Sequence, residues 1–386
     1  MKIIDSKLSA LSCGGRLIVD LDAIKKNYLT LAAKANPARV SAVVKANAYG
    51  LGVERIAPAL YEVGCRDFFV AELCEAFELG ELLQMSRHSS ETLRIFILNG
   101  IERGTETVVA DAGFIPVLNS FDAINDWREI CVSTNKRLPA VIQIDTGMAR
   151  LGLDKTELET LIKDVSIFQA ANILYLLSHL AASDEVENPE NESQRLALLK
   201  AATHLPKTKI AFANSGGIYL GRPYCFDLVR PGLALYGVAP SATSGAVFHP
   251  VLELEARVLQ LRAVEANVKV GYGGTFITQK PTLIATIGVG YADGIHRCLS
   301  HKGAAYFNKA RLPFIGRISM DSITLDVTDL GDDCPKRGDF VELIGRNQTI
   351  GDIARDAGTI PYEILTSLGQ RYDRRYRERA TDLTPL

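Results

Sequence analysis

The sequence lacks several features that define whole classes of protein. No window approaches the roughly 20 apolar residues that a membrane span needs, although 47% of the 386 residues are hydrophobic. The formal net charge is −2, so no basic field is available to attract nucleic acid. The opening MKIIDSKLSALSCGG holds an acid, two lysines and a short apolar stretch, which makes it a poor signal peptide. Internal repeats and low-complexity tracts are also missing.

The cysteines follow no disulfide or metal-binding pattern. Their number is odd, they are scattered, and none forms a CxxC pair: Cys13, Cys65, Cys74, Cys131, Cys225, Cys298 and Cys334. Such a set is typical of free thiols in a reducing compartment. We therefore expect a cytoplasmic protein that is long enough for a large core or two domains.

Short apolar runs alternate with helical patterns through the first part of the chain. Nearly continuous apolar runs indicate strands buried on both faces, as in a parallel sheet covered by helices. Nine runs fit this description: 16–20, 41–45, 67–71, 94–98, 114–118, 140–145, 173–178, 209–213 and 226–230. A (β/α)8 barrel needs eight. Counting back from the last run makes 41–45 the first barrel strand, and leaves 16–20 as a surplus strand that either joins the barrel or pairs with a second domain.

The pattern changes after about residue 240. The run 251–264 alternates with period two, as a half-solvated antiparallel strand does. Further β patterns follow at 281–290, 311–327 and 339–345, and helical patterns at 351–358 and 361–369. The predicted fold class is α/β. It comprises a cofactor-binding TIM-type (β/α)8 barrel over 16–240, followed by a mostly β domain over 241–386.

Reactive side chains follow the predicted barrel strands at their carboxyl ends. Five strands are followed in this way, by Lys45, Arg150, His179, Ser215 and Arg230. Active sites of such barrels lie at that face, and phosphate groups often bind the loops after strands seven and eight. Those loops read NSGG and RPGLALYG here, and their glycines let backbone N–H groups approach an anion. A lysine facing such a loop suits covalent attachment of pyridoxal phosphate.

Each of these residues also has an ordinary structural interpretation. A single lysine at a strand end is usually solvated, and a single histidine is more often a hydrogen-bonded structural residue. The NSGG segment alone is an ordinary turn, and the tyrosines could serve in packing. The functional interpretation is favoured because five signals fall on one face in register.

At this point nine motifs identify a family. They occur at 42–50, 144–152, 178–184, 213–217, 229–237, 270–276, 288–294, 316–322 and 359–363, and begin with AVVKANAYG and IDTGMARLG. In order and spacing the chain resembles the alanine racemases over essentially its whole length. The resemblance implies a pyridoxal phosphate barrel with a β domain, a small amino-acid substrate, and a homodimer with shared active sites.

The resemblance also implies roles for individual residues. Lys45 is expected to carry the cofactor and to act as one catalytic base. Tyr272 is the expected second base, reaching the neighbouring subunit's barrel and activated through a Tyr272–His179–Arg230 chain. Arg230 is expected to face the pyridine nitrogen. The expected phosphate-binding group is Tyr49, Ser215, Gly232, Leu233 and Tyr362.

Substrate contacts follow from the same resemblance. Arg150 and the backbone N–H of Met320 are expected to hold the substrate carboxylate, and Arg150 also reaches the cofactor's phenolic oxygen. Tyr291, Ile360 and Tyr362 resemble a narrow access path that excludes larger substrates. Further residues expected around the site are Gln143, Asn214 and Asp321. No metal is implied.

The sequence departs from the family pattern at two positions. Leu51 stands where relatives commonly have histidine. Gln143 stands where many relatives have a lysine, often carbamylated, that orients the arginine equivalent to Arg150. A glutamine offers a neutral carbonyl acceptor instead of a negative charge. Either its amide oxygen accepts from Arg150, or a small anion takes the place of the missing carboxylate.

Two alternatives to an alanine racemase stay open at this stage. The first is another enzyme of the same fold. A racemase of broader specificity fits the motifs, whereas a decarboxylase would have a carboxylate in place of Arg230. The second is a non-catalytic pyridoxal phosphate carrier, but single-barrel carriers lack the β domain that bears Tyr272 and Met320. The favoured prediction is two-base interconversion of L- and D-alanine, supplying D-alanine for peptidoglycan.

Overall fold

The fold was analysed in a computed structural model that describes residues 13–84, 93–241, 245 and 247–378. Contacts divide the chain into two compact units. Unit 1 holds the chain up to Ala23, Tyr49–Leu51, and the chain from Pro250 onward, and unit 2 holds Ile24–Ala48 and Gly52–His249. The domain limits at 16–240 and 241–386 stay a prediction.

Unit 2 is a nearly closed parallel barrel, which confirms the TIM-type fold. Its sheet runs in the order β2-β10-β9-β8-β7-β6-β5-β4-β3. The terminal strands β2 (Arg39–Val40) and β3 (Ala42–Val43) are consecutive in the chain, with only Ser41 between them. β2 pairs with β10 and β3 with β4, and the Val43 N–H donates to Pro231 O on the β10 side at 3.0 Å. The remaining strands are β4 (Asp67–Val70), β5 (Arg94–Ile97), β6 (Ile115–Leu118), β7 (Pro139–Gln143), β8 (Asn172–Leu177), β9 (Lys209–Ala211) and β10 (Leu228–Val229).

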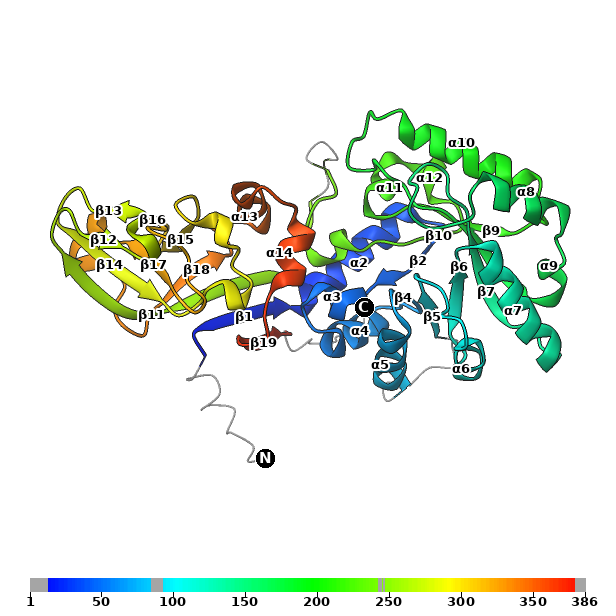
Figure 1. Cartoon of the computed structure of the whole chain (residues 1–386), viewed down its shortest axis with the longest axis horizontal. Helices are drawn as coiled ribbons and strands as arrows, with labels where there is room; N and C mark the ends of the chain where they lie inside the picture. The colour runs from blue at the N-terminus through cyan, green and yellow to red at the C-terminus, as the bar shows by residue number, and fades with distance from the viewer. Residues whose placement is uncertain (1–12, 85–92, 242–244, 246, 379–386) are drawn as a thin grey trace, which may run out of the picture. The chain divides into compact units, whose positions relative to one another are not determined.

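Helices surround the barrel strands in the region where Figure 1 labels β4, β5, β6, β7 and β9. The first, α2 (Leu21–Ala35), begins where Asp20 Oδ1 accepts the Ala23 N–H at 2.8 Å, as expected of a capping aspartate. The others are α3 (Lys45–Tyr49), α4 (Val53–Glu62), α5 (Leu73–Gln84), α6 (Glu106–Ala112), α7 (Phe121–Thr134), α8 (Lys155–Lys163), α9 (Ile167–Ala170), α10 (Glu190–Thr203), α11 (Ser215–Leu220), α12 (Arg222–Cys225) and the 3-10 turn η1 (Leu233–Tyr236). Within the described ranges, none of the helices has the length and apolar character that crossing a membrane requires.

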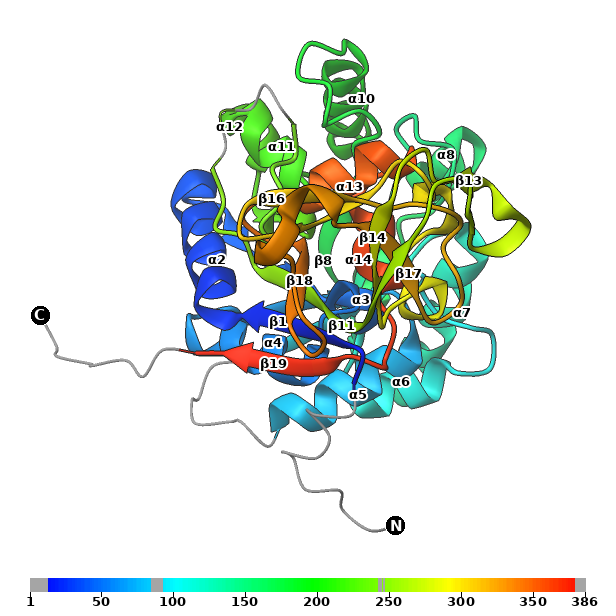
Figure 2. The same cartoon turned by 90° about the vertical axis from the view of Figure 1, so that its left-hand side faces the viewer.

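Unit 1 is built around a long strand, β11 (Leu252–Val264), whose first seven residues alternate between buried and half-buried. This is the period-two pattern read from the sequence. The strand β1 (Gly15–Asp20) pairs antiparallel with β11 and parallel with β19 (Asp373–Arg377), and Figure 2 shows β1 beside the red β19. The run 16–20 therefore belongs to the sheet of unit 1 and not to the barrel sheet.

The other elements of unit 1 complete this mostly β structure. They are β12 (Lys269–Val270), β13 (Phe276–Ile277), β14 (Thr282–Ile287), β15 (Ala304–Phe307), β16 (Ala310–Pro313), β17 (Ile323–Asp326), β18 (Phe340–Ile344), α13 (Ile350–Ala357) and α14 (Pro361–Ser367), with 3-10 turns η2 (Tyr272–Gly274), η3 (Tyr291–Asp293), η4 (Arg297–Leu299) and η5 (Thr328–Asp333).

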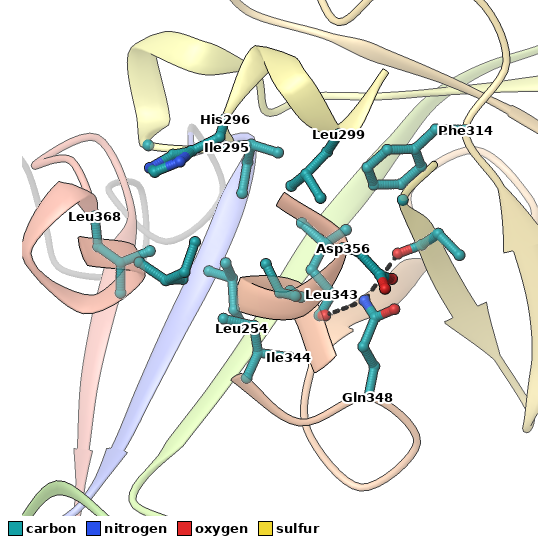
Figure 3. Close-up of a pocket in the computed structure, with 15 residues that line it drawn as sticks. Leu254, Ile295, His296, Leu299, Phe314, Leu343, Ile344, Gln348, Asp356 and Leu368 are labelled. Carbon is teal, nitrogen blue, oxygen red and sulfur yellow. Dashed lines mark hydrogen bonds between the residues drawn. The ribbon is translucent and has the colours of Figure 1, made fainter. Parts of the chain in front are cut away.

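An apolar pocket lies within unit 1, among side chains such as Leu254, Leu299 and Phe314 (Figure 3). The side-chain amide of Gln348 lines this pocket and already has hydrogen-bond partners. Its Nε2 donates to Leu343 O at 2.7 Å and to Ala304 O at 2.9 Å. The pocket is therefore a feature of core packing.

A buried carboxylate joins three strands of the barrel near their first residues. Asp67, whose side chain is 1% exposed, accepts from Arg94 Nε at 2.5 Å and from Arg39 Nε at 3.0 Å. A second Arg94 nitrogen, Nη2, donates to the same carboxylate at 2.9 Å. The paired arginines compensate for burying the Asp67 charge.

We expect Asp67→Ala to lower the free energy of unfolding by about 3 kcal/mol, because it leaves Arg94 without its partner. Urea denaturation measures the change. The control is Glu62→Ala, which removes an exposed ion pair with Lys25 (2.6 Å) and should change stability by less than about 1 kcal/mol. Similar small losses in both variants would show that the Asp67 cluster does not anchor the barrel.

Candidate active site

The predicted site residues of unit 2 follow barrel strands at their carboxyl ends. Lys45 comes two residues after β3, and His179 comes two residues after β8. Ser215 begins α11 after β9, and Arg230 follows β10 directly. Arg150 lies in the segment between β7 and α8. Because the strands are parallel and the sheet closes, these positions share one mouth of the barrel.

A left-handed turn follows directly after Lys45. Ala46, Asn47, Ala48 and Tyr49 all have φ between 52° and 55°. This conformation costs roughly 1–2 kcal/mol for each L-residue, and such strain persists only where surrounding contacts fix it. The Ala48 N–H donates to Val44 O at 2.8 Å, and Asn47 Oδ1 accepts the Val53 N–H at 2.7 Å.

The start of this turn is held by a residue that the sequence analysis missed. Glu75, on α5, accepts the Ala46 N–H at 2.5 Å through Oε1. Its other oxygen, Oε2, accepts the N–H groups of Ala71 (2.7 Å) and Glu72 (3.1 Å). An acid in the first turn of a helix usually interacts with that helix's own N-terminus, so the contact with Ala46 could not be predicted from sequence position alone.

The Lys45 amine is half-buried. Burial lowers its pKa, the nearby Arg150 charge lowers the pKa further, and the Glu75 carboxylate opposes both. Among the described residues the amine forms no hydrogen bond or ion pair. A lysine with a depressed pKa has a larger neutral fraction, and it is the neutral amine that reacts as a nucleophile or base.

Arg230 is a buried cation, and three of its five N–H donors are taken by barrel residues. Its side chain donates to Ala211 O at 3.0 Å and to Ser178 O at 2.7 Å, and Nη2 also lies 3.3 Å from His179 Nδ1. Burial lowers the pKa of Arg230 to about 9, which leaves the guanidinium charged at neutral pH.

His179 is therefore a neutral imidazole of defined tautomer. Since Arg230 can only donate, Nδ1 accepts and Nε2 carries the proton. Burial lowers the pKa of His179 to about 3, together with the charges of Arg230, Arg150 and Lys45. The expected His179–Arg230 contact is thus present. Tyr272, the third member of the expected chain, belongs to unit 1.

Gln194 on α10 supports this arrangement and was not predicted. It is fully buried, and Nε2 donates to His179 O at 2.9 Å and to Thr146 Oγ1 at 3.2 Å. Its Oε1 accepts the Ala181 N–H at 2.8 Å. A single glutamine in a helical run carries no sequence signal for this role.

Ser215 links the two glycine-containing loops predicted to bind phosphate. Its hydroxyl oxygen accepts the N–H groups of Gly232 at 3.1 Å and Ala234 at 3.2 Å. The hydroxyl hydrogen therefore remains available for another acceptor. Leu233 lies between these two donors and begins η1.

Asn214 shapes the same loop. Its Oδ1 accepts the Gly217 N–H at 2.9 Å and the Ser183 hydroxyl at 2.9 Å. A Cβ on Gly216 would lie 2.5 Å from Ser183 O, so a larger residue does not fit there. Ser215 and Gly216 occupy the first positions of α11, where backbone N–H groups have no partner within the helix.

Gln143 does not make the contact expected of it. Its Nε2 donates to Leu151 O at 2.9 Å, and no hydrogen bond joins Gln143 to Arg150 in the part of the chain that the structure describes. Gln143 thus contacts the backbone of Leu151, the residue after Arg150, and does not contact the Arg150 guanidinium. Asp145 fixes the other side of this segment, accepting the N–H groups of Gly147, Met148 and Ala149.

Tyr49 and Tyr362 form an aromatic pair within unit 1, with ring centroids 5.9 Å apart. Burial raises the pKa of Tyr49 above its ordinary value, and the neighbouring Tyr362 adds to the effect. Leu51, which replaces the family histidine, is fully buried, and its carbonyl accepts the Tyr376 hydroxyl at 2.9 Å.

Five other predicted residues of unit 1 are exposed in the single chain: Tyr272, Tyr291, Met320, Asp321 and Ile360. Tyr272 is 71% exposed. It lies on a 3-10 turn between Gly271 and Gly273, both with positive φ.

The loops that carry Tyr291 and Met320 are joined. The Tyr291 N–H donates to Ser319 O at 3.1 Å. Arg371, which was not predicted, donates to Asp321 Oδ1 at 2.6 Å and to Asp293 Oδ1 at 2.8 Å. This cation ties Asp321 to the turn that contains Tyr291.

Comparisons with known proteins give the family. The model described as "Alanine racemase, N-terminal domain" matches residues 19–240, and "Alanine racemase, C-terminal domain" matches residues 251–376. The chain belongs to the alanine racemase family. Together the two matches span both the barrel strands and most of unit 1.

Individual relatives resemble the chain over nearly its full length. The alanine racemase of Brucella ovis is 49% identical over 379 residues, covering 95% of this chain and 94% of the relative. A catabolic alanine racemase of Rhizobium johnstonii is 47% identical over 363 residues, covering 94% and 95%. The crystal structure of alanine racemase from Bartonella henselae, with covalently bound pyridoxal phosphate, matches with a TM-score of 0.90 and 50% identity, covering 94% of this chain and 99% of that one.

We expect His179 to make the stability of the protein depend on pH. The unfolded chain binds a proton at histidine near pH 6.5, whereas the folded protein does so only near pH 3. Its contribution is fully present above about pH 6.5 and is lost at about 1.4 kcal/mol per pH unit as pH falls toward 3.

His179→Asn retains an acceptor and should flatten this slope in urea denaturations between pH 4 and 6. His204→Asn, at an exposed histidine after α10, is the matched control and should keep the wild-type slope. Equal slopes in all three proteins would contradict the assignment of a neutral buried His179.

Proposed function

We propose that this protein interconverts L- and D-alanine with pyridoxal phosphate attached to Lys45. The observation that carries the proposal is the half-buried Lys45 amine, with its lowered pKa, on the barrel face that also bears Arg230–His179 and the Ser215 loop. The names of the relatives support alanine as the substrate, and the Bartonella structure supports the cofactor.

The donors at the barrel mouth fit this cofactor. The Ser215 hydroxyl and the first N–H groups of α11 suit a phosphate dianion. We assign Tyr49, Ser215, Gly232, Leu233 and Tyr362 to the phosphate, with Asn214 shaping the loop. When bound, pyridoxal phosphate takes up the electron pair left at the α-carbon as its proton departs.

Arg230 influences which reaction is favoured. Because it stays charged at neutral pH, it offers the pyridine nitrogen a hydrogen bond and keeps its proton. This arrangement favours simple return of the α-proton over transamination. A decarboxylase of this fold would instead place a carboxylate at this position.

Racemisation removes the α-proton from one face and returns one on the other, so two bases on opposite faces are the simplest arrangement. We assign the Lys45 amine to D-alanine and Tyr272 of the neighbouring subunit to L-alanine. His179 then donates its Nε2 hydrogen to the Tyr272 oxygen and lowers the barrier to forming its anion.

The substrate contacts follow the same assignment. The Arg150 guanidinium and the Met320 N–H hold the carboxylate. Gln143 positions the backbone beside Arg150, and Asp321 positions the Met320 loop through Arg371. Tyr291 and Ile360, together with Tyr362, narrow the access path so that larger side chains are excluded.

The active unit under this proposal is a cytoplasmic homodimer. The seven cysteines are all unpaired, as expected in a reducing compartment. We also propose that the enzyme supplies D-alanine for peptidoglycan. Because catalysis accelerates both directions alike, the same chemistry serves alanine breakdown in relatives named catabolic. Growth of a deletion strain without added D-alanine would contradict the biosynthetic role.

The main competing function is a racemase of broader specificity. A non-catalytic carrier is disfavoured because the match to the C-terminal domain model covers residues 251–376, the part of the chain that bears Tyr272 and Met320. Rates measured with L-alanine, L-serine and L-lysine distinguish an alanine racemase, which acts on L-alanine alone, from a racemase of broader specificity.

We expect the protein to racemise L-alanine and to carry its cofactor on Lys45. Borohydride reduction followed by peptide mapping should find the cofactor on the peptide that contains Lys45. Lys45→Ala should retain no more than about one thousandth of the activity, because it removes both the attachment point and a base. A label on another lysine, or equal rates with L-lysine and L-alanine, would refute the respective parts of the proposal.

We expect activity to return when two inactive variants are mixed. Lys45→Ala and Tyr272→Phe damage different residues, and a hybrid dimer holds one intact shared site out of two. Activity should reach about a quarter of the wild-type value, since about half of randomly exchanged dimers are hybrids. Persistent inactivity, with subunit exchange shown by mass spectrometry, would contradict shared sites.

A further inference from the structure

We propose that Glu75 is a positioning residue for Lys45: it fixes the start of the strained turn through Ala46 and places a negative charge near the amine. The inference rests on the proposed function, since it assumes that Lys45 is the reactive lysine. It concerns a residue that none of the expected site roles includes.

The geometry makes one carboxylate serve two backbone segments. Oε2 accepts from Ala71 and Glu72 and so caps α5. Oε1 points to a different element and accepts the Ala46 N–H at 2.5 Å. Glu75 therefore ties the turn after β3 to the helix that follows β4, the neighbouring barrel strand.

The contact supplies the acceptor for the Ala46 N–H. The turn is also supported by hydrogen bonds from Ala48 N–H to Val44 O, from Gly52 N–H to Asn47 O and from Val53 N–H to Asn47 Oδ1, and none of these uses the Ala46 N–H. Ala46 is the first residue with positive φ and is bonded directly to Lys45. Without an acceptor for its N–H, the turn can relax and move the lysine backbone.

The charge of Glu75 acts on the same lysine. Burial and Arg150 both lower the pKa of Lys45, and Glu75 raises it. Glu75 thus limits how far the pKa of the Lys45 amine is lowered. The amine can then keep the proton that it takes from the substrate. Removing the charge should shift the titration of Lys45 to lower pH.

The simplest competing explanation is that Glu75 only caps α5. A glutamine distinguishes the two roles because it has a single acceptor oxygen where the carboxylate has two. The single amide oxygen of Glu75→Gln can accept a hydrogen bond either from the Ala46 N–H or from the N–H groups at the start of α5, but not from both. Glu75→Ala serves neither, and Glu78→Gln, at an exposed glutamate on the same helix, is the matched control.

Two measurements on the cofactor-free protein test the proposal. Hydrogen–deuterium exchange reports the amides of 46–48 and of 71–72 separately. The pH dependence of Lys45 acetylation by acetic anhydride, followed by mass spectrometry, reports its titration. Cofactor affinity and the pH profile of racemisation are then measured on the loaded enzyme.

We expect Glu75→Ala to speed exchange at 46–48 by about 10-fold to 100-fold, the effect of losing a charge-assisted hydrogen bond. It should also weaken cofactor binding by about tenfold or more. Glu75→Gln should speed exchange at one of the two segments. Both variants should shift the acid limb of Lys45 acetylation to lower pH, while Glu78→Gln matches the wild type.

Faster exchange at 71–72 alone in both variants, with Lys45 titration as in Glu78→Gln, would overturn the proposal and leave Glu75 as a helix cap. If Glu75→Ala does not fold, Glu75→Gln decides by the same two measurements. A cofactor label on a lysine other than Lys45 would refute the proposed function, whereas the exchange results would still show whether Glu75 holds the turn.

Discussion

The arrangement at the barrel mouth depends on how the run 39–43 closes the sheet. This run pairs with β10 on one side and with β4 on the other, so its end is fixed from both directions. The chain then enters a left-handed turn that its own residues disfavour. Burial and the Arg150 charge lower the pKa of the Lys45 amine at the start of this turn, and the Glu75 charge opposes them; the amine has no hydrogen-bond partner among the described residues.

A second constraint is the buried charge of Arg230. A cation within the barrel must be compensated, and here two carbonyl oxygens and an imidazole accept its hydrogen bonds, with no carboxylate among its partners in the described part of the chain. The contact with the charged Arg230 fixes the tautomer of His179, and burial together with the nearby positive charges keeps that ring neutral. Under the proposed function, the same guanidinium, which stays protonated at neutral pH, favours simple return of the α-proton. In this proposal Arg230 therefore has two roles: it keeps His179 neutral, and it favours racemisation over transamination.

Elements with strong periodicity could be predicted from the sequence, and elements made by long-range contacts could not. Most barrel strands are apolar runs that the sequence shows, and the first seven residues of β11 alternate as expected. β19 reads DRRYR and is a strand only because β1 lies beside it. The turn after Lys45 contains alanines, which ordinarily avoid positive φ. Glu75 and Gln194 act through backbone groups distant in sequence. Gln143 donates to the Leu151 carbonyl, a backbone contact that its place in the sequence pattern does not indicate.

The central claim is that two bases address the two faces of alanine. Its most direct test is α-hydrogen exchange into deuterium oxide by Tyr272→Phe, measured separately on L- and D-alanine. The account predicts strongly reduced exchange on L-alanine, while exchange on D-alanine continues with retention of configuration because Lys45 still acts there. Equal loss of exchange on both enantiomers would contradict it and would leave Tyr272 with a structural role.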